Sequence, residues 1–78
     1  MYIEKTPIVV AYFFQTVDER RQFVAACKNS GLAIFSQATI FIRHQPKSKR
    51  FKVVLDRDEI KRKHIKLSEL EGKVNKRG

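Results

Sequence analysis

The hydrophobic pattern at the start of the chain contains a continuous apolar run, PIVVAYFF, over residues 7–14. β-Branched and aromatic side chains dominate this run, which is typical of a strand that is covered on both faces. Successive side chains of a strand point to opposite faces. One face of the predicted strand therefore carries Ile8, Val10, Tyr12 and Phe14, and the other carries Val9, Ala11 and Phe13.

The next segment, TVDERRQFVAACKNSG over residues 16–31, has the signals of a helix. Thr16 and Glu19 have the T-x-x-E spacing of a capping box, acidic residues fill the first turn, and Lys28 lies in the last turn. Gly31 follows as a stop signal. We expect an apolar stripe made of Val17, Phe23, Val24 and Cys27.

Alternating patterns return at residues 32–44, LAIFSQATIFIRH, and at residues 51–56, FKVVLD. They predict one long strand, or two short strands broken near Ser36, and then a further strand. The intervening QPKSKR suits a hairpin loop, because Pro46 cannot donate to a β-ladder. In the first segment one face would hold Ile34, Ala38, Ile40 and Ile42, and the opposite face Phe35, Thr39, Phe41 and Arg43.

The pattern from Arg57 onward fits two structures. Asp58 could cap a helix that carries Ile60, Leu67 and Leu70 inward. Alternatively, HIKL at residues 64–67 alternates like a short strand, and Ser68 with Glu71 has the spacing of a second capping box. We favour the helix, and we expect residues 73–78 to be frayed.

These elements predict a small single α+β domain over residues 1–72, in the order β-α-β-β, with a basic, helical C-terminal segment and a basic tail at residues 73–78. We expect a three-stranded sheet, with space for a fourth short strand, and one helix packed on one face. The other face would be uncovered, and exposed apolar faces commonly form interfaces. The C-terminal segment, a second copy in a homodimer or stacked bases could each cover it. The predicted interface residues are Val9, Phe13, Phe35 and Phe41.

Chain length and cysteine content limit the class of protein. A chain of 78 residues buries only about 60% of its unfolded surface on folding. The single cysteine, Cys27, cannot form an internal disulfide, which favours a reducing, cytoplasmic location. The apolar run ending at Phe14 is too short to span a bilayer and lacks the cleavage site of a signal peptide. We therefore expect no membrane partner.

Charge provides the main functional signal. The net charge is +9, and residues 43–78 hold 13 of the 17 basic residues against five acidic ones. Basic side chains that neutralise phosphates release condensed counterions, so this half of the chain fits a nucleic acid. An acidic protein surface, or a solvated loop with no specific role, fits the same charge. The candidate nucleic-acid-binding residues are Arg43, His44, Lys47, Lys49, Arg50 and Lys52 in the hairpin, and Arg57, Lys61, Arg62, Lys63 and Lys66 in the following basic run, and we expect the two groups to merge into one positive surface.

Catalytic chemistry has weak support. Glu59-Ile60-Lys61 matches the E-x-K fragment of metal-dependent nucleases, with Asp56 and Asp58 as candidate metal-binding carboxylates. Acidic residues at the start of a helix are common capping residues, so capping is the preferred interpretation.

Metal and cofactor signals are weaker still. Cys27, His44 and His64 lack the paired spacing of a zinc site, and the three glycines do not form a phosphate-binding loop. We expect no catalytic residue, no metal site, no cofactor and no enzyme activity.

Aromatic residues among basic strands leave two interpretations. RNA-binding sheets use such rings to stack on unpaired bases, but the aromatic signature of the RNA-recognition motif is absent here, and strand aromatics are commonly core residues. The leading hypothesis is a small, basic, nucleic-acid-associated accessory protein. RNA or a ribonucleoprotein is preferred over duplex DNA, because no recognition helix with base-reading side chains is evident. The alternative is a non-enzymatic protein-binding modulator, such as a phage- or virus-encoded adaptor or inhibitor, that docks its basic face on an acidic or nucleic-acid-processing partner.

Overall fold

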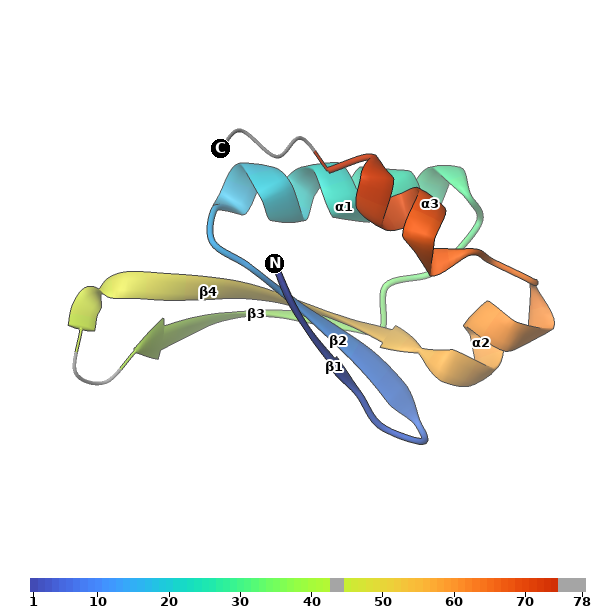
Figure 1. Ribbon diagram of the computed structural model, residues 1–78, viewed down its shortest axis with the longest axis horizontal. Helices are drawn as coiled ribbons and strands as arrows, with labels where there is room; N and C mark the ends of the chain where they lie inside the picture. The colour runs from blue at the N-terminus through green and yellow to red at the C-terminus, as the bar shows by residue number, and fades with distance from the viewer. Residues whose placement is uncertain (43–44, 75–78) are drawn as a thin grey trace.

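The computed structural model describes residues 1–42 and 45–74, with only the backbone described for residues 42 and 45–48. The described elements are β1 (Tyr2–Lys5), β2 (Val9–Phe14), α1 (Val17–Asn29), β3 (Ser36–Ile42), β4 (Gln45–Asp56), α2 (Arg57–Arg62) and α3 (Leu67–Gly72). Figure 1 shows α1 and α3 on one side of the sheet and α2 at the end of β4. The predicted small α+β fold is therefore confirmed.

The sheet has the order β1-β2-β4-β3, and every neighbouring pair is antiparallel. β2 and β3 consequently run in the same direction with β4 between them, and α1 forms the crossover that connects them. The fourth short strand is β1, which pairs Tyr2 with Phe13 and Lys5 with Val10. We call the face that carries α1 and α3 the helix face, and the opposite face the open face.

The predicted capping box of α1 is present. The Glu19 backbone N–H donates to Thr16 Oγ1, and the Thr16 N–H donates to Glu19 Oε1, both at 3.1 Å. After the helix ends, Gly31 has φ 79°, a conformation that L side chains rarely adopt. Val17 is 40% exposed, so the buried stripe begins six residues later than predicted, at Phe23, and continues with Ala26 and Cys27.

Three aromatic rings form the centre of the core between β2 and α1. Tyr12, Phe14 and Phe23 are all 0% exposed. The Phe23 ring centroid lies 4.4 Å from that of Tyr12 and 5.2 Å from that of Phe14. Aromatic pairs at such tilted geometries contribute about 0.5–1.5 kcal/mol each beyond the area they bury. The core therefore depends on the register that places β2 under α1.

The C-terminal segment forms two helices, so the prediction of a single helix from Asp58 is wrong. α2 is capped by Asp56, whose Oδ1 accepts from the Asp58 N–H at 2.9 Å, and the chain then turns at His64, which has φ 55°. α3 starts at Leu67 without a side-chain cap, so the Ser68 capping box does not form. The carboxylate that would complete this box, Glu71, instead accepts a hydrogen bond from the buried Tyr12 hydroxyl at 2.6 Å.

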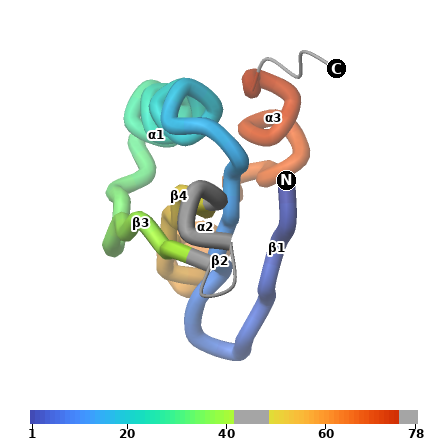
Figure 2. The backbone as a smooth tube through the Cα atoms, turned by 90° about the vertical axis from the view of Figure 1, so that its left-hand side faces the viewer, coloured from blue at the N-terminus to red at the C-terminus, as the bar shows by residue number. Residues whose placement is uncertain are grey.

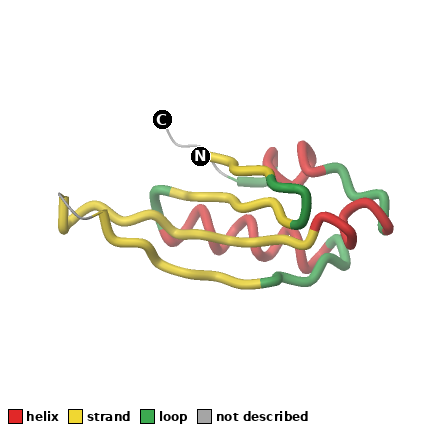
Figure 3. The backbone as a smooth tube through the Cα atoms, turned by 90° about the horizontal axis from the view of Figure 1, so that it is seen from below, coloured by secondary structure: helices red, strands yellow, loops and turns green. Residues whose placement is uncertain are grey.

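α3 packs beside α1 on the helix face, as Figure 2 shows. The C-terminal segment up to Val74 therefore does not cover the open face. Val74 is 5% exposed and belongs to the core, two residues beyond the expected end of the domain. Seen from below in Figure 3, the open face of the sheet carries no other described element.

β4 begins at Gln45, within the segment that was predicted to be the hairpin loop. Residues 45–50 belong to β4, and a register shift lies between Phe41 and Ile42. Pro46 is compatible with this part of β4, because β2 pairs with β4 only from Phe51 onward and leaves one side of the strand without a neighbour.

Removing the Tyr12 hydroxyl tests the link between β2 and α3. We expect Tyr12→Phe to lower the free energy of unfolding by about 1.5–3 kcal/mol, the range for hydrogen bonds to charged groups. Urea unfolding followed by circular dichroism measures the change. Tyr2→Phe is the matched control, because Tyr2 is 60% exposed, and it should change stability by less than about 0.5 kcal/mol. Equal losses in the two variants would contradict a stabilising role for the bond.

Candidate nucleic-acid interface

The β3–β4 hairpin projects beyond the rest of the domain. β2 ends at Phe14, which pairs with Phe51, so the earlier residues of β4 pair with β3 alone. We call this two-stranded part, residues 40–42 and 45–50, the arm. Figures 1 and 3 show it extending past the sheet and α1 at one end of the molecule.

The described side chains of the arm combine basic and apolar groups on both of its faces. Phe41 and Lys49 are partners in the register and lie on the helix face, beyond the end of α1. Lys49 Nζ lies 5.4 Å from the centroid of the Phe41 ring, which is 63% exposed. On the open face, Ile40 pairs with Arg50, whose Nη1 donates to the Lys49 carbonyl at 3.0 Å.

The open face continues this pattern toward the body of the sheet. Lys52 Nζ lies 5.5 Å from the centroid of the Phe13 ring, and the Phe13 centroid lies 5.6 Å from that of Tyr2. Cation–π contacts at exposed sites contribute about 0.5–1 kcal/mol each. Because alternate residues of β4 share a face, Arg50 and Lys52 are neighbours on the open face, and Lys52 is the one placed over Phe13.

Arg20 of α1 contacts the helix face of the sheet next to the base of the arm. Its guanidinium carbon lies 5.2 Å from the centroid of the Phe51 ring, and its Nη1 donates to the Ala38 carbonyl at 3.0 Å. Sequence reasoning did not include Arg20, Tyr2 or Ile40 among the candidate binding residues. Their proximity comes from the strand register and the position of α1, which no local motif encodes.

Three of the six predicted hairpin residues have less structural information. Arg43 and His44 lie outside the described residues, and the side chain of Lys47 is not described. Only Lys49, Arg50 and Lys52 of the predicted hairpin set therefore have described side chains. The interface set is split: Val9 and Phe13 lie on the open face, whereas Phe41 lies on the helix face, so these residues do not form one uncovered surface as predicted. Phe35 precedes β3 and is 67% exposed.

The second basic run lies at the opposite end of the molecule. Lys49 and Lys52 precede Arg57 by eight and five residues along β4, so at about 3.3 Å per residue they lie about 26 and 17 Å from it. The longest extent of the molecule is 39 Å. The prediction that the two basic groups merge into one surface is therefore wrong for the described residues.

Two members of the second run make contacts that hold the fold together. Arg57 Nη1 donates to the Thr6 carbonyl at 2.8 Å. Lys63 Nζ donates to the Gly31 carbonyl at 2.6 Å and lies 3.8 Å from Glu59 Oε2. The other members, Lys61, Arg62 and Lys66, are exposed.

The candidate nuclease carboxylates have structural roles. Asp56 caps α2, and Glu59 Oε1 accepts a hydrogen bond from the Ala33 N–H at 3.1 Å. In the described part of the chain, no group of three or more histidine, cysteine, aspartate or glutamate residues is placed to hold a metal ion. The E-x-K match thus lies in the first turns of α2, where Glu59 is hydrogen-bonded to the loop after α1.

Cys27 is a core residue. It is 0% exposed, and its burial raises the pKa of the thiol to about 11. The thiolate is the reactive form of cysteine, so Cys27 stays protonated and inert near neutral pH.

Comparison of the chain with models of protein families, with curated proteins and with solved structures found no significant match. Within residues 1–42 and 45–74, none of the helices has the length and apolar character needed to cross a bilayer.

The burial of Cys27 can be tested by thiol labelling at pH 8. A rise in pKa from 9.0 to about 11 lowers the thiolate fraction about a hundredfold, and burial slows the reaction further. We expect native protein to react at least about a hundredfold more slowly with a thiol reagent than protein unfolded in urea. The matched control is C27A/S30C, which moves the thiol to an exposed position nearby on the chain and should react at the unfolded rate. Fast labelling of native Cys27 would contradict this assignment.

Proposed function

We propose that the protein is a small, non-enzymatic nucleic-acid-binding accessory protein that contacts phosphates through the β3–β4 arm. The observation that supports this most is a group of three cations: Lys49 and Arg50 in the arm, and Lys52 next to it. They lie close to aromatic and aliphatic side chains, several of them exposed. Among the described residues, ion pairs join Arg21 to Asp18 and Lys63 to Glu59, and neither involves these three cations. Their charge is therefore free to neutralise phosphates.

The aromatic rings favour an unpaired strand, such as single-stranded RNA, over duplex DNA. Single-stranded nucleic acids bind to surfaces where a basic track follows the backbone and aromatic rings stack on the bases. Phe41 and Tyr2 are exposed at 63% and 60% and have cations nearby or on the same face. Each stacked base contributes about 1–3 kcal/mol. A duplex presents phosphates but keeps its bases stacked internally, so it would use the cations and leave the rings without a partner.

The distant position of the second basic run limits its role in this proposal. Charges separated by much more than the Debye length, about 10 Å at 0.1 M salt, are largely screened from one another. Lys61, Arg62 and Lys66 would therefore bind a separate stretch of a long strand, and they would contribute little to binding a short oligonucleotide held at the arm.

Two triple variants with equal charge loss test the arm directly. We expect K49A/R50A/K52A to weaken binding of a short single-stranded RNA by at least about tenfold in moderate salt, about 0.1 M. The dependence of log K on log salt should also become shallower by about 2, because each phosphate contact on a single strand contributes about 0.7. Fluorescence anisotropy over a salt series measures both quantities.

The control variant is K61A/R62A/K66A, which removes the same charge from the other end of the molecule. It should retain the affinity within about threefold in moderate salt, because those side chains lie beyond the screening distance. Equal losses in the two variants, or weak binding by the wild-type protein at low salt, would refute the arm as the binding site. Circular dichroism should confirm that both variants are folded.

A protein-binding modulator is the second candidate, and the exposed edge of the sheet favours it. β3 is an edge strand of seven residues, Ser36–Ile42, without a charged side chain. Exposed edges of this kind accept an added strand from a partner, and native proteins usually protect them with charges. In that case the basic arm would orient an acidic partner while β3 supplied backbone hydrogen bonds.

A pull-down from nuclease-treated lysate distinguishes the two functions. If the arm binds nucleic acid, we expect the recovered partners to be lost after nuclease digestion. A stoichiometric protein that stays bound after digestion and a moderate-salt wash would favour the modulator instead.

A further inference from the structure

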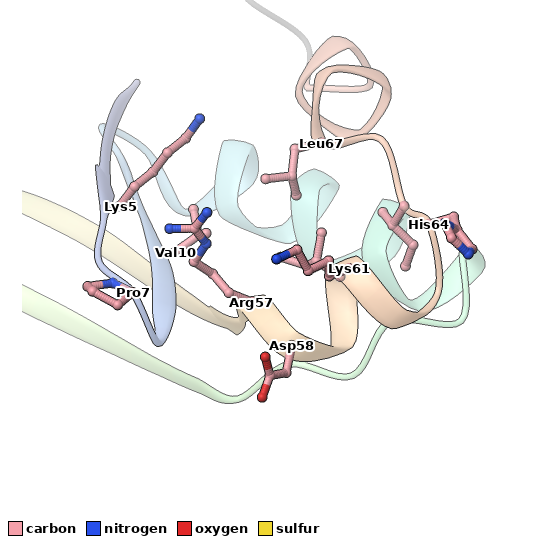
Figure 4. Close-up of a pocket in the computed structure, with 10 residues that line it drawn as sticks. Lys5, Pro7, Val10, Arg57, Asp58, Lys61, His64 and Leu67 are labelled. Atoms are coloured by element: carbon pink, nitrogen blue, oxygen red, sulfur yellow. The ribbon is translucent and has the colours of Figure 1, made fainter.

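A pocket of about 520 Å³ lies at the end of the molecule opposite the arm. It is enclosed by the β1–β2 connection, α2, and the segment that leads into α3, as Figure 4 shows. Its volume falls within the range of about 300–1,000 Å³ that is usual for small-molecule sites. The pocket belongs neither to the arm nor to the contacts that hold the core rings together.

The chain builds this pocket because the C-terminal segment is broken into two helices. α2 continues directly from β4, and the turn at His64, with φ 55°, sends the chain back toward β1. Ile65 and Leu67 then line the pocket together with Val10 and Ile60. Val10 is 2% exposed and Ile60 9% exposed, so the floor of the pocket is apolar and belongs to the core.

The rim of the pocket is positively charged. Lys5, Arg57 and Lys61 line it, against one carboxylate, Asp58. Figure 4 shows the Asp58 carboxylate pointing away from the other labelled side chains. Arg57 is held in place by the Thr6 carbonyl at 2.8 Å, which uses only one of its five N–H donors. In the described part of the chain, Lys5 and Lys61 have neither an ion pair nor a side-chain hydrogen bond.

We propose that this pocket binds a small amphiphilic anion, with a carboxylate or phosphate at the basic rim and an apolar body against the core floor. The positive rim would bind the anionic head group of such a ligand, and the apolar floor would bind its hydrocarbon part. An ionised head group gains charge-assisted hydrogen bonds from Arg57 and the two lysines. An apolar body removes water from the floor formed by Val10, Ile60 and Leu67. This site is separate from the proposed nucleic-acid-binding function.

Neither half of the ligand is sufficient alone. A bare phosphate, including one in a nucleic-acid backbone, would leave the apolar floor unused. A neutral apolar molecule would leave three cations at the rim without compensation, and desolvating them unpaired is unfavourable. The proposal therefore predicts that binding requires both parts in one molecule.

Three probes with the same eight-carbon chain test this requirement: octanoate, octyl phosphate and 1-octanol, with inorganic phosphate as a fourth probe. Each probe is titrated into the 78-residue protein, with the two anionic amphiphiles kept below their micelle-forming concentrations. Binding is followed through backbone amide chemical shifts. We expect at least one of the anionic amphiphiles to bind at least about tenfold more tightly than octanol or inorganic phosphate. The largest shifts should fall at Val10, Ile60, Ile65 and Leu67.

Charge-removing variants locate the head group. K5M/K61M should weaken binding of the anionic probe by at least about tenfold, whereas K28M/K73M, which removes two exposed lysines away from the pocket, should change it less than about twofold. The arm variant K49A/R50A/K52A should bind the probe as the wild type does, so a failure of this proposal and a failure of nucleic-acid binding are distinguishable. The proposal is overturned if neither anion binds, if octanol or inorganic phosphate binds as tightly, or if K5M/K61M retains full affinity.

Discussion

The difference in length between β4 and β2 determines how the molecule is organised. β4 has 12 residues and β2 has six, and they pair only from Phe51 to Asp56. Where the two strands overlap, their side chains meet α1 and α3 and form the core. Where β4 continues alone with β3, no helix covers it and the arm results. The same strand thus supplies the buried Val53 and Leu55 and, in the arm, the exposed Lys49 and the half-buried Arg50.

The C-terminal helices complete a core that the sheet and α1 leave incomplete. Leu70 and Val74 are 3% and 5% exposed, and the Tyr12 hydroxyl reaches Glu71. Burial, together with this carboxylate, raises the pKa of Tyr12 well above its usual value, so the phenol stays neutral. In a chain this small, where the net stability is only a few kcal/mol, one such contact between distant segments is a considerable part of the total.

Sequence reasoning predicted the elements whose signals are local. The capping box at Thr16 and the apolar run before Phe14 each specify an element by themselves, and both were predicted correctly. β1 was missed because YIEK has no apolar run and becomes a strand only by pairing with β2. The division of the C-terminal segment into two helices was missed because Glu71 accepts a hydrogen bond from Tyr12, 59 residues away. A contact over that separation leaves no local pattern in the sequence. The two basic groups are visible in the sequence, but their separation to two ends of the molecule is not. That separation follows from the length of β4, which was predicted to begin at Phe51.

The arm is held only by its own two strands, and this has a consequence for its motion. Its backbone hydrogen bonds can open without disturbing the Tyr12, Phe14 and Phe23 rings, because those rings lie beneath α1 and α3. Local opening of such a hairpin requires less free energy than global unfolding, so its amide protons should exchange with solvent before those of the core. The same independence means that a substitution in the arm can alter what the protein contacts without changing the packing of these three rings.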